Sequence, residues 1–105
     1  MNFIAIAACP TGVAHTFMVK AALEKAAKEL GHSIKVETQG ATGLENKLTV
    51  EDIKNADVLI LSVEVSVIEK ERFANIPKVN IPQKTAIKSP KRVLTQIEEK
   101  INTNK

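Results

Sequence analysis

Short apolar runs and helical repeats alternate along the chain, and together they predict an α/β domain. Residues 3–8 form an apolar run, which predicts a strand that is buried on both faces. Over residues 14–30 apolar side chains recur at close to the helical period and Gly31 follows, so we expect a helix of about four turns. Residues 33–38 alternate between apolar and polar side chains and predict a second strand, followed by a Gly-containing loop over 40–48.

The second half of the chain repeats this alternation with shorter elements. Thr49 is a suitable N-cap for a short helix that runs to about Asn55. Residues 58–61 are apolar and branched, and they predict the central strand of the sheet. After a further short helix, residues 76–80 predict a weaker strand, because proline is acceptable only at the start or the edge of a strand.

A last helix should begin with Ser89 as N-cap and Pro90 at its first position, since its apolar side chains share one face. The whole order is strand, helix, strand, short helix, strand, short helix, strand, helix. It predicts about four parallel strands with right-handed crossovers and helices on both faces. We therefore expect a three-layer open α/β sheet, Rossmann-like or phosphatase-like, as a single domain over residues 1–101 with a frayed tail over 102–105.

Composition then narrows the classes of function. The chain has 105 residues, of which 44% are hydrophobic and 26% charged, with four Gly and four Pro, as expected for a globular domain. Its only aromatic residues are three Phe, too few to stack single-stranded nucleic acid, so we expect no nucleic-acid partner. Residues 78–105 carry seven Lys or Arg against two Glu. Such a segment is typical of a solvated surface, or of a docking patch for an acidic protein or an anionic membrane.

The few candidate metal ligands limit the chemistry further. A single cysteine excludes an internal disulfide, and Cys9, His15 and His32 are too few for a structural zinc site. We expect His32 to lie on the surface, because it follows the glycine that ends the first helix. No stretch approaches the roughly 18 apolar residues that cross a bilayer, and the start lacks the basic region of an export signal. These features predict a cytoplasmic protein.

The segment that joins the first strand to the first helix carries the candidate chemistry. Ligands of parallel sheets bind at the carboxyl ends of the strands, beside the point where the strand order reverses. A Gly-containing loop that enters a helix offers backbone N–H groups to an anion, and it would also stabilise a thiolate. We therefore predict Cys9 as a nucleophile with a phosphate-binding loop formed by Pro10, Thr11, Gly12, Val13, Ala14, His15 and Thr16.

Each of these residues also has a plainer interpretation. Cys9 could be a small core residue, and Thr11 and Thr16 could be local caps rather than phosphate contacts. His15 could donate to a phosphate, orient the loop or simply pack. The spacing is also that of cysteine-dependent phosphatases, except that His15 stands where they have the arginine that clamps the phosphoryl group. A small cysteine-dependent phosphatase or arsenate reductase is therefore the alternative function.

Four segments together resemble one known family. They are residues 8–18, Val36-Glu37-Thr38-Gln39-Gly40, residues 48–61 and Glu71-Arg72-Phe73-Ala74. They resemble the fructose-family IIB component, type 2, of the bacterial phosphoenolpyruvate-dependent sugar phosphotransferase system (PTS). The similarity extends over nearly all of residues 1–100. One departure follows the third predicted strand, where the family has an Ala-Asp pair and this chain has Ser62-Val63-Glu64-Val65.

The resemblance implies a phosphoryl relay. A phosphohistidine of a IIA component would give its phosphoryl group to Cys9, and the phosphorylated IIB chain would pass it to a sugar imported by a membrane IIC component. Fructose is the default sugar of the family. The chain would then be a protein-phosphohistidine–sugar phosphotransferase that works through a phosphocysteine intermediate, with no cofactor and no metal. Gln39, Gly40 and Glu64 are the expected neighbours of Cys9.

The same resemblance implies transient partners. A relay domain has to dock on both IIA and IIC with the edge that carries Cys9, so small interfaces are expected there. We expect a monomer that associates with the inner face of the membrane only through IIC. The candidate apolar docking residues are Val13, Phe17 and Met18.

Overall fold

Five strands form a single sheet in the order β3-β2-β1-β4-β5. The computed structural model describes residues 2–8, 13–40, 43–63 and 70–103; the side chains of 13–15, 40, 43–44, 70 and 102–103 lie outside that description. The strands are β1 (Asn2–Ala8), β2 (Ser33–Gly40), β3 (Gly43–Glu45), β4 (Val58–Val63) and β5 (Lys78–Asn80). Strands β1, β2, β4 and β5 are parallel, which confirms the predicted four-stranded parallel sheet, and β3 pairs antiparallel with β2.

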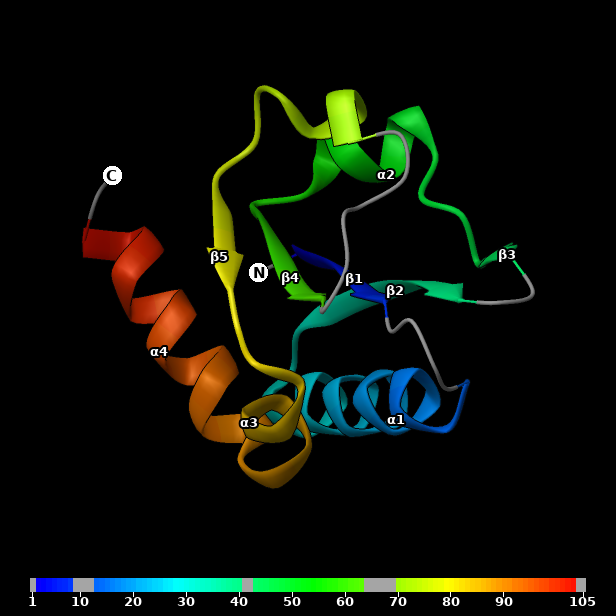
Figure 1. Cartoon of the computed structure of the whole chain (residues 1–105). Helices are drawn as coiled ribbons and strands as arrows, with labels where there is room; N and C mark the ends of the chain where they lie inside the picture. The colour runs from blue at the N-terminus through cyan, green and yellow to red at the C-terminus, as the bar shows by residue number, and fades with distance from the viewer. Residues whose placement is uncertain (1, 9–12, 41–42, 64–69, 104–105) are drawn as a thin grey trace.

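Helices cover both faces of this sheet, as Figure 1 shows. They are α1 (Val13–Leu30), α2 (Val50–Asn55), the 3-10 helix η1 (Lys70–Phe73), α3 (Gln83–Lys88) and α4 (Pro90–Thr103). Helices α1, α3 and α4 lie on one face, and α2 and η1 lie on the other. Within the described ranges, no helix combines the length and the apolar content that crossing a membrane requires.

Strand β1 is the centre of the core. Its side chains from Phe3 to Ala8 are at most 3% exposed, because both faces of the strand are covered. Phe3, Ala5 and Ala7 belong to the cluster on the α1 face, where small alanines allow a helix to lie close to the sheet. Ile4 and Ile6 belong to the cluster on the opposite face. This double burial is the reason that the sequence of β1 is a continuous apolar run.

Helix α2 begins at the predicted N-cap. The Thr49 hydroxyl accepts a hydrogen bond from the Asp52 amide at 3.1 Å, and the Asp52 carboxylate accepts one from the Thr49 amide at 2.9 Å. This reciprocal capping box satisfies two backbone donors that the helix itself leaves open. The same carboxylate oxygen of Asp52 accepts from the Lys35 ammonium at 2.6 Å, which ties α2 to β2.

Three predicted elements differ from the observed ones. The expected loop over 40–48 contains strand β3, which pairs with the end of β2. The middle of the sheet is β1 rather than β4, because the chain adds strands on both sides of β1. The short helix expected between β4 and β5 is the single 3-10 turn η1.

Helix α3 was not predicted, and it changes the role of Ser89. No element was predicted over residues 81–88, but residues 83–88 form a short helix that ends with Ser89 as its C-cap. Helix α4 follows at Pro90, so Ser89 is shared by two helices rather than being only an N-cap. Helix α4 continues to Thr103, two residues past the expected domain end at 101.

The prediction that His32 lies on the surface is wrong, since its side chain is only 10% exposed. Its backbone amide donates to the Ala27 carbonyl at 2.8 Å as Gly31 turns the chain with a φ of 78°. The imidazole ring packs edge-on against Phe3, and Nε2 lies 2.9 Å from the Glu98 carboxylate. The residue therefore fastens α4 to the sheet instead of facing solvent.

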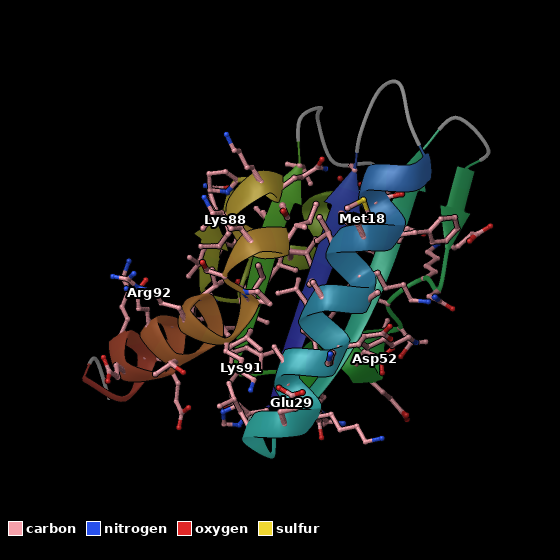
Figure 2. All side chains as sticks on the ribbon, turned by 90° about the horizontal axis from the view of Figure 1, so that it is seen from below. Met18, Glu29, Asp52, Lys88, Lys91 and Arg92 are labelled. Carbon is pink, nitrogen blue, oxygen red and sulfur yellow. The ribbon has the colours of Figure 1, made fainter. Side chains whose placement is uncertain are left out.

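A second ion pair joins the last turn of α1 to the first turn of α4. The Lys91 ammonium contacts the Glu29 carboxylate, and this contact is the largest of the causes that lower the pKa of Glu29. Figure 2 shows these two side chains facing each other at one end of α1, with Met18 near the other end.

The Asp52 contacts predict a specific acid sensitivity. The hydrogen bond from Lys35, followed by that from the Thr49 amide, lowers the pKa of Asp52 from 3.8 to about 2. A carboxyl with a lowered pKa contributes stability above its ordinary pKa, and this contribution is lost as the pH falls through the folded value. The wild type should therefore lose stability between pH 3.8 and about 2 more steeply than Asp52→Asn. Urea unfolding midpoints measured across this range check the prediction.

Lys35→Met supplies the matched control for this prediction. It leaves the Thr49 bonds to Asp52 in place, so its acid dependence should lie between those of the wild type and Asp52→Asn. Parallel pH profiles for all three proteins would contradict the assigned role of Asp52.

Candidate functional site

The predicted site lies where the parallel strands end. Strand β1 ends at Ala8, and the register pairs Ala8 with Gln39 of β2 on one side and with Val63 of β4 on the other. The three strand ends are therefore level. The chain adds β2 on one side of β1 and β4 on the other, so the switch point of the sheet lies between β1 and β4.

Much of the predicted phosphate-binding loop lies outside the described residues. Cys9, Pro10, Thr11 and Gly12 are among these, and so is Glu64, which follows β4 directly. What the structure defines is the position of both ends of the loop. One end is Ala8, in the middle strand, and the other is the first turn of α1.

Helix α1 begins directly after this loop. Val13, Ala14 and His15 form its first turn, so these residues of the predicted loop belong to the helix, which begins one residue before the expected start at about residue 14; their side-chain roles stay predictions. The first turn contains no acidic residue, so no carboxylate opposes the positive end of the helix dipole there. Thr16 follows and its side chain is buried. The interpretations of Thr16 as a cap and as a phosphate contact both stay open.

Two apolar side chains project from the same end of α1. Phe17 is 44% exposed and Met18 is 49% exposed, so two consecutive large apolar residues are accessible at this end of the helix. Figure 2 shows Met18 near the N-terminal end of the helix. Two of the three predicted docking residues are therefore accessible, and they lie within about one turn of the loop.

Gln39 and Gly40 are the last two residues of β2, so the structure places both at the edge where Cys9 follows β1. The Gln39 side chain is buried, and its amide nitrogen donates to the Glu37 carboxylate at 2.7 Å. Sequence periodicity ended the strand at Thr38, because the alternation stops there and a glycine follows at position 40. Pairing with β3 extends the strand through both residues.

Glu37 is a buried carboxylate that the sequence pattern placed on a polar strand face. Its two oxygens accept from the two terminal nitrogens of Arg72, each at 3.0 Å, which is a bidentate ion pair. One oxygen also accepts from the Leu48 amide at 2.9 Å. Arg72 in turn donates to the Leu48 carbonyl and lies over the Phe73 ring, 4.7 Å from its centre.

These contacts decide the charge state of the buried pair. Burial raises the pKa of Glu37, but hydrogen bonds from Arg72, the Leu48 amide and Gln39 outweigh it, so the pKa lies below its ordinary value of 4.5. Glu37 is therefore a carboxylate at neutral pH, and its charge orients Gln39 at the end of β2. The sequence analysis named Arg72 only as part of a segment that resembles the family, and it did not identify Arg72 as the partner of Glu37.

Substitution of Arg72 should show how much an unpaired Glu37 carboxylate destabilises the folded protein. Arg72→Met should lower the free energy of unfolding by about 3–5 kcal/mol at neutral pH, because Glu37 keeps its charge and loses its partner. The loss should begin to shrink above pH 4.5, because burial without Arg72 raises the pKa of Glu37 in the variant, and it should shrink further below 4.5. In that range the wild-type pair loses its contribution and the variant no longer buries a charge. Urea unfolding as a function of pH measures both effects.

The double variant Arg72→Met/Glu37→Gln provides the control. It removes the buried charge together with its partner, so a large part of the stability should return. A stability loss in Arg72→Met that is equally large in acid and at neutral pH would rule out an uncompensated Glu37 carboxylate as its cause.

The sequence matches known proteins along almost its whole length. The family described as "PTS system, Lactose/Cellobiose specific IIB subunit" matches residues 4–96. The "PTS system fructose-like EIIB component 2" of Escherichia coli (strain K12) is 47% identical over 97 residues, which cover 92% of each chain. The "PTS system fructose-like EIIB component 1" of the same strain is 47% identical over 100 residues, covering 95% of this chain and 93% of the relative.

Solved structures share the fold as well. The solution structure of an Enzyme IIB subunit of the PTS system from Escherichia coli K12 superimposes with a TM-score of 0.91 at 45% identity, over 98% of this chain and 95% of that one. A domain of the fructose-specific IIABC component from Borrelia burgdorferi gives a TM-score of 0.83 at 41% identity, over 90% of each chain. Family, relatives and fold agree with the resemblance carried by the loop and strand motifs, and the chain belongs to the PTS IIB family, with relatives that are described as fructose-like EIIB components.

Proposed function

We propose that this IIB chain carries a phosphoryl group on Cys9, taken from a phosphohistidine of a IIA component and passed to a fructose-type sugar during uptake through a membrane IIC component. The observation that supports this most strongly is the arrangement of the two described elements that flank Cys9 in the sequence. It directly follows the middle strand at the switch point of the sheet and precedes an N-terminal helix turn without carboxylates. Backbone N–H groups and the helix dipole favour both a thiolate and a bound phosphoryl group at such a position.

The proposed reaction has two displacement steps. In the first, the Cys9 thiolate attacks phosphorus, the S–P bond forms, the N–P bond of phosphohistidine breaks, and the imidazole recovers a proton from solvent. In the second, a sugar hydroxyl attacks, the O–P bond forms, the S–P bond breaks and the thiolate returns, while the hydroxyl proton goes to a base. Both steps are balanced with no change of oxidation state, and the proposal includes no cofactor and no metal. Sulfur suits the middle position because it is both a good nucleophile and a good leaving group.

The proposed sugar rests on the names of the relatives. Both Escherichia coli relatives are described as fructose-like, whereas the family description names lactose and cellobiose. At 47% identity the relatives are the more specific guide, so a fructose-type sugar is the proposed acceptor. The domain from Borrelia burgdorferi is part of a IIABC component, which supports IIA and IIC as the partners of this domain. We place the chain in the cytoplasm, at the membrane only while it is docked on IIC.

The single cysteine makes the central claim simple to test. When phosphoryl groups are supplied from phosphoenolpyruvate through purified upstream carriers and a fructose-type IIA, the wild type should gain one phosphoryl group and Cys9→Ser should gain none. Intact-protein and peptide mass spectrometry measure the gain and its position. Equal labelling of Cys9→Ser would overturn the phosphocysteine proposal.

An assay with an aryl phosphate separates the relay from the alternative phosphatase or arsenate reductase. A relay protein should show no sustained release of phosphate, because His15 stands where those enzymes place the clamping arginine. Steady turnover of the aryl phosphate, or arsenate reduction by the wild type with a thiol donor, would favour the alternative.

The exposed apolar end of α1 gives a prediction about docking on IIA. Phe17→Ser combined with Met18→Ser should slow phosphoryl transfer from IIA roughly tenfold or more, because apolar anchors at the centre of an interface contribute about 1.4 kcal/mol or more. Stability should change little, since both side chains are already exposed. Rapid-quench measurement of phosphorylation at limiting IIA gives the rate.

Val50→Ser is the matched control for docking. Val50 is 82% exposed and belongs to α2, on the other face of the sheet. The same apolar-to-polar change there should leave the transfer rate unaltered. Equal rates for Val50→Ser and the double variant would remove the end of α1 from the proposed interface.

A further inference from the structure

A buried carboxamide connects the ends of the two strands that flank the switch point. Gln83, the first residue of α3, is 6% exposed. Its amide nitrogen donates to the Ala8 carbonyl of β1 at 2.8 Å and to the Ser62 carbonyl of β4 at 3.1 Å. The two hydrogen atoms of one NH₂ group thus bridge two adjacent parallel strands near their carboxyl ends.

The Ala8 carbonyl has a special position in the chain. It belongs to the planar peptide group that joins Ala8 to Cys9, so a hydrogen bond to its oxygen restrains the plane of that group. Gln83 is 75 residues away in the sequence, yet its side chain donates a hydrogen bond to the carbonyl of Ala8, the residue directly before the proposed nucleophile. A side chain of α3 is therefore able to influence where the chain enters the loop.

The base of the Gln83 side chain is itself firmly held. The amide of Ile81 donates to the Leu61 carbonyl of β4 at 2.8 Å, which fastens the chain just before α3 to the sheet. The Ala86 amide donates to the Pro82 carbonyl at 3.0 Å, and Ala86 is fully buried in the core cluster beneath α1. The carboxamide therefore projects from a rigid support, which a positioning group requires.

The orientation of the carboxamide is set by its two acceptors. Both carbonyls can only accept, so the NH₂ group must face them and the Oε1 oxygen must point elsewhere. That oxygen is buried and has no hydrogen-bond partner among the described residues. Retention of a buried unsatisfied oxygen is costly for folding, which suggests that the side chain is not there for stability alone.

We propose that Gln83 is a positioning residue for Cys9, which holds the peptide group between Ala8 and Cys9 so that the thiol meets its phosphoryl donor in a fixed place. This inference rests on the proposed function of Cys9, and it adds to that function a residue that sequence reasoning did not identify. Gln83 touches neither substrate nor sulfur in this role, and it acts only through the backbone carbonyl of Ala8.

Gln83→Met tests the proposal, because Met keeps the length and burial of the side chain but donates no hydrogen bond. With the folded variant, phosphoryl transfer from IIA to Cys9 should fall about ten- to a hundredfold, as expected when a reacting group is misplaced by a fraction of an ångström. The pH midpoint for alkylation of Cys9 by iodoacetamide should also move upward, because a displaced thiolate loses stabilising N–H groups. The chain has one cysteine, so alkylation reports Cys9 alone.

Ser62→Ala is the matched control. The Ser62 hydroxyl is buried without a partner among the described residues, and its removal leaves both carbonyl acceptors of Gln83 in place. This variant perturbs the packing of the same site, yet it should keep the wild-type alkylation midpoint and transfer rate. A change of equal size in Ser62→Ala and Gln83→Met would mean that general packing is responsible, and it would overturn the positioning role.

A wild-type measurement covers the case in which Gln83→Met does not fold. The side-chain NH₂ resonances of Gln83 should shift when Cys9 is alkylated with iodoacetamide, while the side-chain NH₂ resonances of Gln96, an exposed residue of α4, should not. Unchanged Gln83 resonances would overturn the proposal. Because alkylation requires no phosphoryl donor, failure of the positioning role is distinguishable from failure of the relay, which would appear as an unphosphorylated wild type.

Discussion

Burial of β1 on both faces is the constraint on which the rest of the structure depends. A strand in this position needs neighbours on both edges and helices on both sides, and the chain supplies β2 and β4 as the neighbours. The chain crosses over β1 after adding β2, and the switch point therefore falls beside its carboxyl end. The residue that follows β1 is Cys9. Packing of the apolar residues 3–8 thus decides where the loop that carries the proposed nucleophile begins.

Polar groups around this apolar centre are few, and Glu37, Arg72 and Gln83 have defined partners. The Glu37 and Arg72 pair lies beside β1 on the α2 face and orients Gln39 at the end of β2. Gln83 reaches the ends of β1 and β4 from the α1 face. Buried polar contacts specify one geometry more strictly than apolar packing does, because an unsatisfied group is expensive. In this fold they lie next to the strand ends, where the proposed chemistry needs fixed positions.

Sequence periodicity predicted the elements whose structure follows from the local pattern of apolar and polar residues. The runs of β1 and β4, the period of α1, the Thr49 cap and the weak strand at β5 all follow from local patterns, and the loop and strand motifs were specific enough to indicate the family. Periodicity failed where distant contacts override local signals. Glu37 read as a solvent-facing position because its partner Arg72 is 35 residues away. Gln83 was not singled out because its acceptors lie far away in sequence, in β1 and β4, and His32 was misplaced because α4 covers it.

The short strands at the two margins of the sheet have a consequence for the protein in a crowded solution. Unpaired strand edges invite other chains to add to a sheet, which is a common route to aggregation. One margin is β3, only three residues long, and the other is β5, also three residues long and preceded by Pro77. Lys78 adds a positive charge at the start of β5. The apolar strands β1 and β4 are thereby kept in the interior of the sheet, whereas β3 covers only the end of β2, from Thr38 to Gly40.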